Sequence, residues 1–596
     1  MPAHRIAALR ARMAEHGMHA YIVPTSDFHS SEHMGAYFQA RRYLADFTGS
    51  AGTLVVTGED AGLWTDGRYF LQAEQQMKGN GVKLYKMGEP GVPTITQYLI
   101  DHMPHGCVVG MDGRVASAAY VKSIRTALEA QSPTIMLERD LVGEIWEDRP
   151  PISEAKAFLY PEKYAGKART QKLNELRDVI AKKGADAHLL TTLDDIAWLF
   201  NIRGDDILFE PLVFSYAVVE QNSAHLFINP NKLDEAARAE LLTDGITLHP
   251  YEEVYEFIKG YGEGTSVLMC SDVVNSALYE LVSAKAIVID AENPTVAMKT
   301  LKNDTELEGM RRAHIKDGVA LARFMRWVKE NVGKEKITEL SAGKKASEFR
   351  AQMEGFVSDS FQTICGYKEH GAIIHYGATP ETDVELKPSG MVLFDSGGQY
   401  LDGTTDVTRT IALGPITDTE KEHFALVLRA MLRLSEARFL HGARGMNLDI
   451  LSRGLFWEKD LDYKHGTGHG VGCFLCVHEP PVGFRWNVVP ERNDSCVFEP
   501  GMVVSDEPGI YVAGSHGVRT ENLIACRAGE ENEFGKFLYF ETLTYAPIDL
   551  DAVDKKYMTD EDIRRLNDYH AKVYEKLSPY MDDEEKEWLK RYTRAI

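Results

Sequence analysis

The stretch MVLFDSGGQYLDGTTDVTRTIAL, residues 391–413, contains two apolar segments separated by a glycine-rich connection. The first segment ends in Asp395, and the second begins near Asp406. Short apolar runs that are bounded by glycine are typical of buried strands. The stretch therefore predicts a pair of strands that carries one carboxylate at the end of the first strand and one at the start of the second.

A second stretch, MVVSDEPGIYVAGSHGVRTENLIAC at residues 502–526, follows the same plan. An apolar strand ends in Glu507, a glycine-containing hairpin follows, and a return strand carries Glu521. In both stretches, a strand ends in an acid, a turn follows, and a second strand carries another acid. This shared plan predicts a duplicated α/β unit. Each half of this unit would contribute one pair of carboxylates.

Four carboxylates at the ends of apolar strands are costly to bury, because they repel one another and their pKa values rise. A divalent metal ion removes this penalty. Carboxylate oxygens with few sulfur ligands favour Mn²⁺, Co²⁺, Fe²⁺ or Zn²⁺ over copper(I) or an iron–sulfur cluster. For a single acid, a turn or a surface ion pair is the ordinary interpretation, but four acids in two matching hairpins favour a metal site.

Histidines gather between these stretches. KHGTGHGVGCFLCVHEPP, residues 464–481, contains His465, His469 and His478, and the first two are flanked by glycines. Glycine lets the backbone pass close to a ligand, and a neutral imidazole binds divalent metals or carries protons. Upstream, GAIIHY places His375 at the end of a short apolar run. Histidines in such a pattern are more often functional than structural.

The first half of the chain contains an internal repeat. A Leu-Arg pair beginning at Leu9 is followed at fixed offsets by Gly17 and Ala20, and the pair beginning at Leu176 is followed in the same way by Gly184. Each copy predicts an amphipathic helix that glycine closes, followed by an apolar strand. The repeat predicts two related α/β domains of about 150 residues each.

Taken together, these segments resemble the pita-bread metallopeptidases, and specifically the cytosolic-type three-domain Xaa-Pro aminopeptidase (aminopeptidase P) family. The motifs are FDSGGQYLDGTTDVTRT, HGTGHGVGCFLCVHEPP, SDEPGIY, VRTENL, AIIHY and WTDGRY. The resemblance implies an α/β (α+β) chain with two related α/β N-terminal domains, at 1–148 and 149–302. A pita-bread catalytic domain would follow at 303–596, ending in a charged helical extension from about 551. This extension contains Trp588 and several tyrosines and is too apolar to be a free tail, so we expect it to pack on the body or on a partner chain.

The resemblance also assigns roles to individual residues. The expected metal ligands are Asp395, Asp406, His469, Glu507 and Glu521. Asp406 and Glu521 would bridge two divalent ions, most often Mn²⁺, with Co²⁺ or Zn²⁺ as alternatives. The expected catalytic and substrate-binding residues are Glu507, His375, His465, His478, Arg519 and Tyr511.

The implied reaction is hydrolysis of the N-terminal Xaa-Pro bond of peptides by a metal-bridging hydroxide. Three alternatives share the fold: prolidase, which cleaves Xaa-Pro dipeptides, methionine aminopeptidase, and a non-enzymatic pita-bread binding protein. Prolidase normally has one N-terminal domain, methionine aminopeptidase usually lacks such large ones, and the binding proteins tend to lose metal ligands. All five ligand types are intact here, which favours the aminopeptidase.

Composition limits the partners. The net charge of −23 disfavours nucleic acid and anionic membranes, and the sequence contains no run of about 18 apolar residues that would span a bilayer. Seven cysteines at scattered spacings are typical of reduced thiols in the cytoplasm. The family resemblance further implies a homodimer, with the C-terminal extension as a plausible interface.

Overall fold

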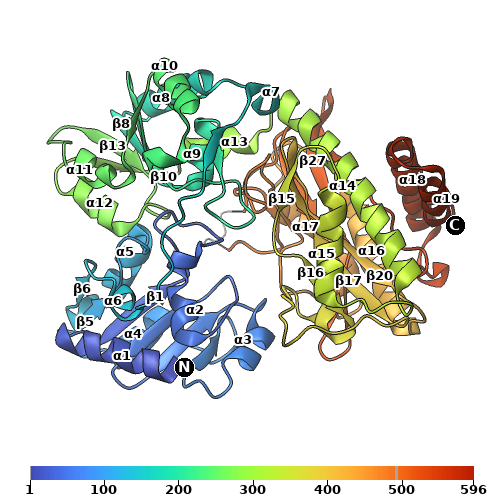
Figure 1. Cartoon of the computed structure of the whole chain (residues 1–596), viewed down its shortest axis with the longest axis horizontal. Helices are drawn as coiled ribbons and strands as arrows, with labels where there is room; N and C mark the ends of the chain where they lie inside the picture. Colours follow the sequence, from blue (N-terminus) through green and yellow to red (C-terminus); the bar gives the residue numbers. More distant parts are fainter. Residues whose placement is uncertain (1, 490–493) are drawn as a thin grey trace. The chain divides into compact units, whose positions relative to one another are not determined.

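The computed structural model describes residues 2–489 and 494–596. The chain divides into two compact units, one made of Met1–Glu162 with Lys167–Thr295 and the other of Lys163–Gly166 with Val296–Ile596 (Figure 1). The chain passes between units within the short helix α7 (Glu162–Ala165), again just after it at Gly166, and within α13 (Pro294–Thr300). Within the described residues, every helix is too short or too polar to cross a lipid bilayer.

The first unit contains two six-stranded sheets with the same strand order and the same directions. The first sheet has the order β4-β3-β2-β1-β5-β6. Its strands are β1 (Ala20–Pro24), β2 (Thr53–Thr57), β3 (Ala61–Thr65), β4 (Lys83–Lys86), β5 (Val108–Gly110) and β6 (Thr134–Met136). Strands β1, β2 and β3 are antiparallel neighbours, whereas β4, β5 and β6 each pair in parallel.

The second sheet repeats this plan with the order β12-β11-β10-β8-β13-β14. Its strands are β8 (Ala187–Leu190), β10 (Ser215–Glu220), β11 (Ala224–Ile228), β12 (Ile246–His249), β13 (Ser266–Met269) and β14 (Ile287–Asp290). Strands β8, β10 and β11 are antiparallel, and β12, β13 and β14 pair in parallel. Matching topology is what the repeat in the sequence predicts. The two-unit division does not separate the two related domains, so the boundaries at 148 and 302 remain predictions.

The predicted helix–glycine–strand element is present in both copies. Helix α1 (Pro2–Glu15) precedes Gly17, which has a φ of 63°, and α8 (Arg169–Lys182) precedes Gly184, with a φ of 73°. Glycine adopts this left-handed conformation without steric cost, so it ends each helix and turns the chain into β1 or β8. The other helices of this unit are α2 (Ala40–Ala45), α3 (Phe70–Gln76), α4 (Ile95–His102), α5 (Ala118–Ala127), α6 (Leu141–Ile145), α9 (Leu193–Leu199), α10 (Glu235–Thr243), α11 (Val254–Ile258) and α12 (Ser276–Ser283).

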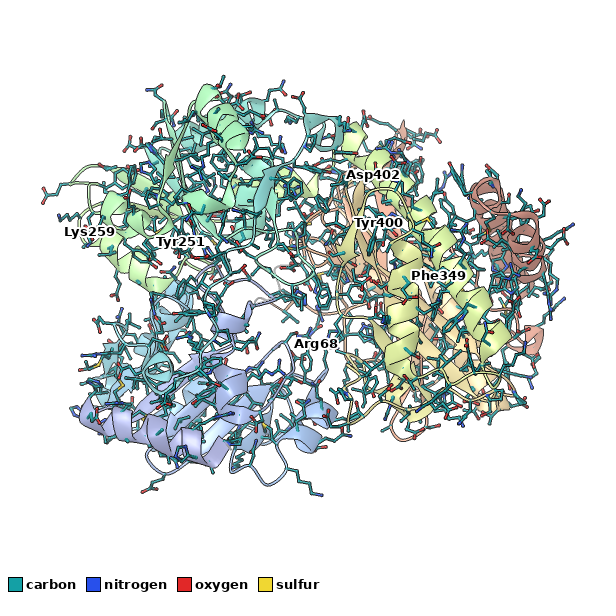
Figure 2. All side chains as sticks on the ribbon, in the orientation of Figure 1. Arg68, Tyr251, Lys259, Phe349, Tyr400 and Asp402 are labelled. Atoms are coloured by element: carbon teal, nitrogen blue, oxygen red, sulfur yellow. The ribbon has the colours of Figure 1, made fainter. Side chains whose placement is uncertain are left out.

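The second unit begins with a long helix, α14 (Asp304–Asn331), which Asn303 and Glu306 cap reciprocally. The helices that follow are α15 (Glu339–Arg350), α16 (Asp418–Ser435), α17 (Gly445–Trp457), α18 (Asp560–Leu577) and α19 (Asp583–Tyr592). The hairpin between β18 (Gly398–Tyr400) and β19 (Gly403–Thr404) is tied to α14. Tyr400 donates to Asp317 over 2.9 Å, and Arg312 pairs with Asp402; Figure 2 labels this tyrosine and this aspartate.

Both predicted strand pairs are present in this unit. Strand β17 (Met391–Ser396) lies antiparallel to β20 (Val407–Ala412), and β24 (Val503–Asp506) lies antiparallel to β27 (Asn522–Asn532). The second pair differs from the expectation in detail, because Glu507 and Glu521 lie just outside the strands. A separate hairpin of β25 (Gly509–Val512) and β26 (His516–Arg519) is inserted between them. The remaining strands are β15 (Phe356–Asp359), β16 (Ile364–Tyr367), β21 (Arg438–Leu440), β22 (Gly468–His469), β23 (Gly483–Phe484) and β28 (Gly535–Thr542).

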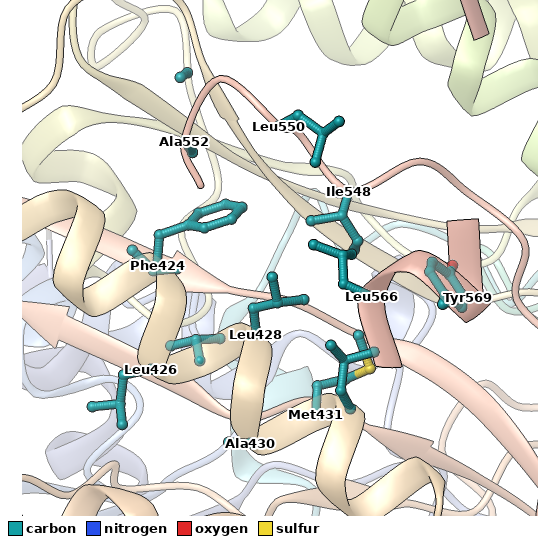
Figure 3. Packing of buried hydrophobic residues seen from close by; sticks show 14 of the residues in the cluster. Phe424, Leu426, Leu428, Ala430, Met431, Ile548, Leu550, Ala552, Leu566 and Tyr569 are labelled. Atoms are coloured by element: carbon teal, nitrogen blue, oxygen red, sulfur yellow. The ribbon is translucent and has the colours of Figure 1, made fainter. Parts of the chain in front are cut away.

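The C-terminal helices pack on the body of the second unit, as predicted for a tail with this many apolar residues. One hydrophobic core joins them to α16 (Figure 3). Its members include Phe424, Leu428, Met431, Ile548, Leu566, Tyr569, Val573, Leu577 and Leu589. The extension is therefore part of the core of the second unit.

Candidate metal centre

Three predicted ligands meet directly in the structure. One ligand atom from each of Asp406, His469 and Glu521 lies within 4.8 Å of the other two. Asp406 immediately precedes β20, His469 ends the short strand β22, and Glu521 lies between β26 and β27. His469 Nε2 lies 3.4 Å from Asp406 Oδ2. Residues that are up to 115 positions apart in the sequence thus form one cluster, because the antiparallel strand pairs bring their ends together.

Glu507 and Asp395 lie at the edges of this cluster. Glu507 Oε1 is 3.5 Å from His469 Nε2 and accepts a hydrogen bond from Ser505. Asp395 is opposite Thr408 in the β17–β20 register and receives a hydrogen bond from Arg519 through Oδ2. The structure therefore brings all five predicted metal ligands to the same region.

The electrostatics of the acids fit a cation. Burial and the neighbouring carboxylates raise the pKa of Asp395 and of Glu521, and burial raises the pKa of Glu507 to about 7. In addition, Asp395 Oδ1 and Glu521 Oε1 are buried without a hydrogen-bond partner. A buried polar atom in this state is costly unless something binds it. Oxygen-rich donors with one imidazole suit hard and borderline divalent metals, so the residues fit the predicted ions.

His469 is oriented to use its Nε2 atom. Its Nδ1 lies 2.9 Å from the carbonyl oxygen of Gly470, which can only accept a hydrogen bond. The ring therefore carries a proton on Nδ1 and directs Nε2 at Asp406 and Glu507. Burial lowers the pKa of His469, but these two acids outweigh it and raise the pKa to about 9. A metal ion would replace the Nε2 proton.

His465, Tyr511 and Arg519 form a hydrogen-bonded chain beside the acids. His465 Nδ1 lies 2.7 Å from the carbonyl oxygen of Gly466, so Nδ1 carries the proton and Nε2 accepts one. Tyr511 lies 2.9 Å from that Nε2 and accepts from Arg519 over 2.8 Å, so its own hydroxyl proton points at His465. Burial, reinforced by Arg519, lowers the pKa of His465 to about 3. The imidazole is therefore a neutral acceptor.

The two remaining predicted histidines, His375 and His478, lie on separate loops. The His478 ring centroid is 4.3 Å from that of His469, with the rings nearly perpendicular. His375 is half-buried and follows a 3₁₀ turn at Lys368–Ala372. The carbonyl oxygen of its neighbour, Ile374, accepts a hydrogen bond from Arg519 over 3.4 Å. Arg519 thus connects the His375 loop to Asp395.

Sequence reasoning missed Glu339, which anchors the loop before His375. This buried carboxylate accepts hydrogen bonds from the backbone amide of Tyr367 and the hydroxyl of Tyr376, and pairs with His370 over 3.0 Å. The hydrogen bond from His370 to Glu339 raises the pKa of that histidine. Nothing in the local sequence distinguishes Glu339 from an ordinary first-turn helix acid, because its partners lie about thirty residues away.

A buried ion pair on α17 was missed as well. Arg453 binds Asp449 over 2.7 Å and donates to the carbonyl oxygen of His465 over 3.0 Å. Thr467 donates to Asp449 over 2.6 Å, and its carbonyl oxygen accepts from the backbone amide of Glu507. The spacing of Asp449 and Arg453 by four positions in an otherwise apolar helix was a usable signal for a buried pair. The pair holds the backbone on which His465 and His469 lie.

Family models match almost the whole chain. The Creatinase/Prolidase N-terminal domain is matched twice, at residues 5–137 and 148–306. Metallopeptidase family M24 is matched at residues 308–528, and the C-terminal region of peptidase_M24 at 536–596. The M24 match spans all five clustered ligand candidates.

Curated relatives resemble the chain along its full length. A probable Xaa-Pro aminopeptidase P from Aspergillus flavus is 37% identical over 99% of this chain and 92% of its own length. Aminopeptidase P2 from Arabidopsis thaliana is 37% identical over 99% of this chain and 88% of its own length. The chain belongs to the Xaa-Pro aminopeptidase family of M24 metallopeptidases. Membership confirms the predicted class of metallopeptidase.

Solved structures agree with this family. The X-prolyl aminopeptidase from Caenorhabditis elegans, described as a cytosolic enzyme with a di-nuclear active site, is 32% identical with a TM-score of 0.94. The match covers 100% of both chains. An Xaa-Pro dipeptidase from Bacillus anthracis is 24% identical, with a TM-score of 0.51, over 64% of this chain and 99% of its own; that likeness shows the fold alone. The predicted fold class, with two creatinase-type domains before a pita-bread domain, is confirmed.

Proposed function

We propose that this chain is a dinuclear-metal aminopeptidase that hydrolyses the N-terminal Xaa-Pro bond of peptides. The observation that carries the proposal is the cluster of Asp406, His469 and Glu521, whose ligand atoms lie within 4.8 Å of one another. Glu507 and Asp395 lie at its edges, and Asp395 and Glu521 each bury one oxygen without a hydrogen-bond partner. The full-length likeness to Xaa-Pro aminopeptidases supports the substrate class.

The proposed ions are Mn²⁺, with Co²⁺ or Zn²⁺ as alternatives. The di-nuclear active site of the Caenorhabditis elegans relative supports two ions. The proposed ligands are Asp395, Asp406, His469, Glu507 and Glu521, with Asp406 and Glu521 shared between the ions. When bound, two such ions would lower the pKa of a bridging water toward neutrality, so that hydroxide is available to attack the scissile carbonyl.

The chain's own residues would manage the protons and orient the substrate. Glu507, which lies 3.5 Å from His469 Nε2 at the edge of the cluster, would accept a proton and return it to the leaving nitrogen. This return matters for proline, because its peptide nitrogen carries no hydrogen and must gain a proton to leave as an amine. His478 and His375 would donate hydrogen bonds to the substrate carbonyl oxygen as negative charge develops on it. Tyr511, His465 and Arg519 would hold Asp395 and the His375 loop in place.

Metal removal tests this function. Chelation of the metal is expected to abolish release of the first residue from an Xaa-Pro-Pro tripeptide, and Mn²⁺ is expected to restore it. The three substrates to compare are the tripeptide, an Xaa-Pro dipeptide and a Met-Ala-Ser peptide. Preferential cleavage of the tripeptide supports the proposal. Activity restricted to the dipeptide would identify a prolidase instead, and full activity after exhaustive chelation would remove the metal mechanism.

We also propose a cytoplasmic homodimer. The cytoplasmic location is supported by the cytosolic Caenorhabditis elegans relative, and cell fractionation tests it. The dimer is supported by an exposed apolar patch on and beside α17, where the Trp457 and Trp486 rings lie 6.0 Å apart. The patch consists of Met446, Ile450, Trp457, Trp486 and Val488, each at least 40% exposed. This location differs from the C-terminal extension expected from the sequence, whose apolar face is occupied within its own chain.

Light scattering is expected to give twice the chain mass of 66.7 kDa. Ile450→Glu places a charge in the patch and is expected to shift the mass toward one chain. Phe534→Glu is the matched control, because Phe534 is 74% exposed at the turn between β27 and β28 and is not a member of the patch. A wild-type mass of one chain, or equal behaviour of the two variants, would contradict the proposed interface.

A further inference from the structure

A buried arginine connects the metal centre to the C-terminal extension. Arg409 lies on β20, three positions after Asp406, and is 1% exposed. Its guanidinium donates hydrogen bonds only to neutral oxygens among its observed partners. These are Thr408 O (2.8 Å), Glu521 O (2.6 Å), Asn522 Oδ1 (2.8 Å), Ala546 O (3.0 Å), Tyr569 OH (2.8 Å) and Pro547 O (3.2 Å).

These acceptors come from three separate segments. Thr408 is on β20, next to Arg409 itself. Glu521 and Asn522 lie where β27 begins. Ala546, Pro547 and Tyr569 belong to the C-terminal region. Tyr569 on α18 has a double role, because its hydroxyl accepts from Arg409 and from the backbone amide of Ala546, and donates to the carbonyl oxygen of Ala546. Figure 3 shows Tyr569 on its helix at the edge of the shared core. The Arg409 guanidinium therefore joins strand β20, the segment that carries Glu521, and the C-terminal extension.

The backbone of Glu521 is fixed on both sides by this arrangement. Its amide donates to the carbonyl oxygen of Thr408 over 3.1 Å, and its own carbonyl oxygen accepts from Arg409. The hydroxyl of Thr408 then donates to Glu521 Oε2 over 2.7 Å, which leaves the buried Oε1 free of hydrogen bonds. The direction of the Glu521 carboxylate is thus set by groups that Arg409 holds.

A charged side chain buried without an acidic hydrogen-bond partner is costly, and an apolar side chain would fill the same space at lower cost. The cost is understandable if the guanidinium is needed for something other than stability. Groups behind a metal ligand fix its orientation, and their loss typically lowers metal affinity.

We propose that Arg409 and Tyr569 are positioning residues through which the C-terminal extension orients Glu521 for metal binding. This inference rests on the proposed function, since it takes Glu521 as a ligand. It gives the extension a role in the reaction, although none of its residues belongs to the metal cluster.

Tyr569→Phe is the decisive variant, because it keeps the ring in the core and removes only the hydroxyl that binds Arg409. Tyr592→Phe is the matched control. Tyr592 lies on α19 of the same extension and donates to Asp551 over 2.9 Å, but this contact does not reach Arg409 or Glu521. The Mn²⁺ affinity of the metal-stripped full chain would be measured by calorimetry at a temperature where every variant is folded. The Tm of each variant would be measured separately by circular dichroism.

Tyr569→Phe is expected to raise the Mn²⁺ dissociation constant about tenfold, whereas Tyr592→Phe should retain the wild-type value even where its Tm falls equally. Arg409→Lys keeps the charge but loses most of the donors, so its affinity should fall further; if it does not fold, Tyr569→Phe decides. Equal affinities for Tyr569→Phe and Tyr592→Phe would overturn the inference. Failure of the proposed site is distinguishable, because wild type would then bind no Mn²⁺, or Glu521→Gln would bind it as tightly as wild type.

Discussion

Glu507→Gln is expected to lower kcat for an Xaa-Pro-Pro tripeptide by about a thousandfold. Glutamine has nearly the same shape as glutamate, but it can neither accept a proton at neutral pH nor neutralise a cation. The Glu507 carboxylate lies 3.5 Å from His469 Nε2, at the edge of the proposed metal cluster. Initial rates over a range of tripeptide concentrations, at saturating Mn²⁺, measure the effect.

The neighbouring Asp506, the last residue of β24, provides a matched control. Burial raises the pKa of Asp506 far above its ordinary value, and its carboxyl is bound by Ser435 over 2.8 Å. Ser435 ends α16, so the Asp506 carboxyl faces that helix instead of the metal cluster. Asp506→Asn keeps the shape of the side chain and an oxygen that can accept from Ser435, and it should change kcat only a few-fold. A comparable loss in both variants would show that Glu507 acts through folding alone.

Glu521→Gln is expected to abolish measurable activity and, at the same time, to raise the Tm of the metal-free protein. Burial and the neighbouring acids Asp406, Asp395 and Glu507 raise the pKa of Glu521 well above its ordinary value, so its charge destabilises the fold when no cation is bound. An amide removes that repulsion, while it also removes a ligand. Thermal melts of chelated protein and calorimetric Mn²⁺ titrations test the two halves of this prediction.

The pH dependence follows from the same shift. Because the folded chain holds the Glu521 proton to a higher pH than the unfolded chain does, the folded state binds more protons and stability falls as pH rises. The loss begins above the ordinary glutamate pKa and ends above the raised one. Metal-free wild type should therefore melt at progressively lower temperature over this range, and Glu521→Gln should lose less. A Tm of the variant below wild type at neutral pH would contradict the argument.

The ligand cluster was predictable from sequence because its signals are local. Each acid lies at the end or the start of an apolar strand, and the glycine-flanked residues His465 and His469 share one short segment. The duplicated sheets were predictable for the same reason, since the Leu-Arg and glycine offsets lie within single helix–strand elements. The precise ends of the second strand pair were not predictable. The inserted β25–β26 hairpin leaves Glu507 just after β24 and Glu521 just before β27.

The groups that support the cluster were not predictable from any local pattern. Arg409 and Tyr569 are 160 positions apart, and Arg519 and Asp395 are 124 apart. Glu339 appears in sequence as a common first-turn acid, yet it is buried against the loop before His375. Such roles depend on which distant segments meet, and burial rather than residue type identifies them.

The placement of Tyr569 has a consequence for how the chain matures during synthesis. The two sheets of the first unit are complete by Asp290, so they can fold while later residues are still being made. The metal-ligand segment reaches its final arrangement later, because one partner of Arg409 is the hydroxyl of Tyr569, which is translated well after Glu521. Full affinity for the cations would therefore be reached only after residues well beyond the last ligand, Glu521, have been made.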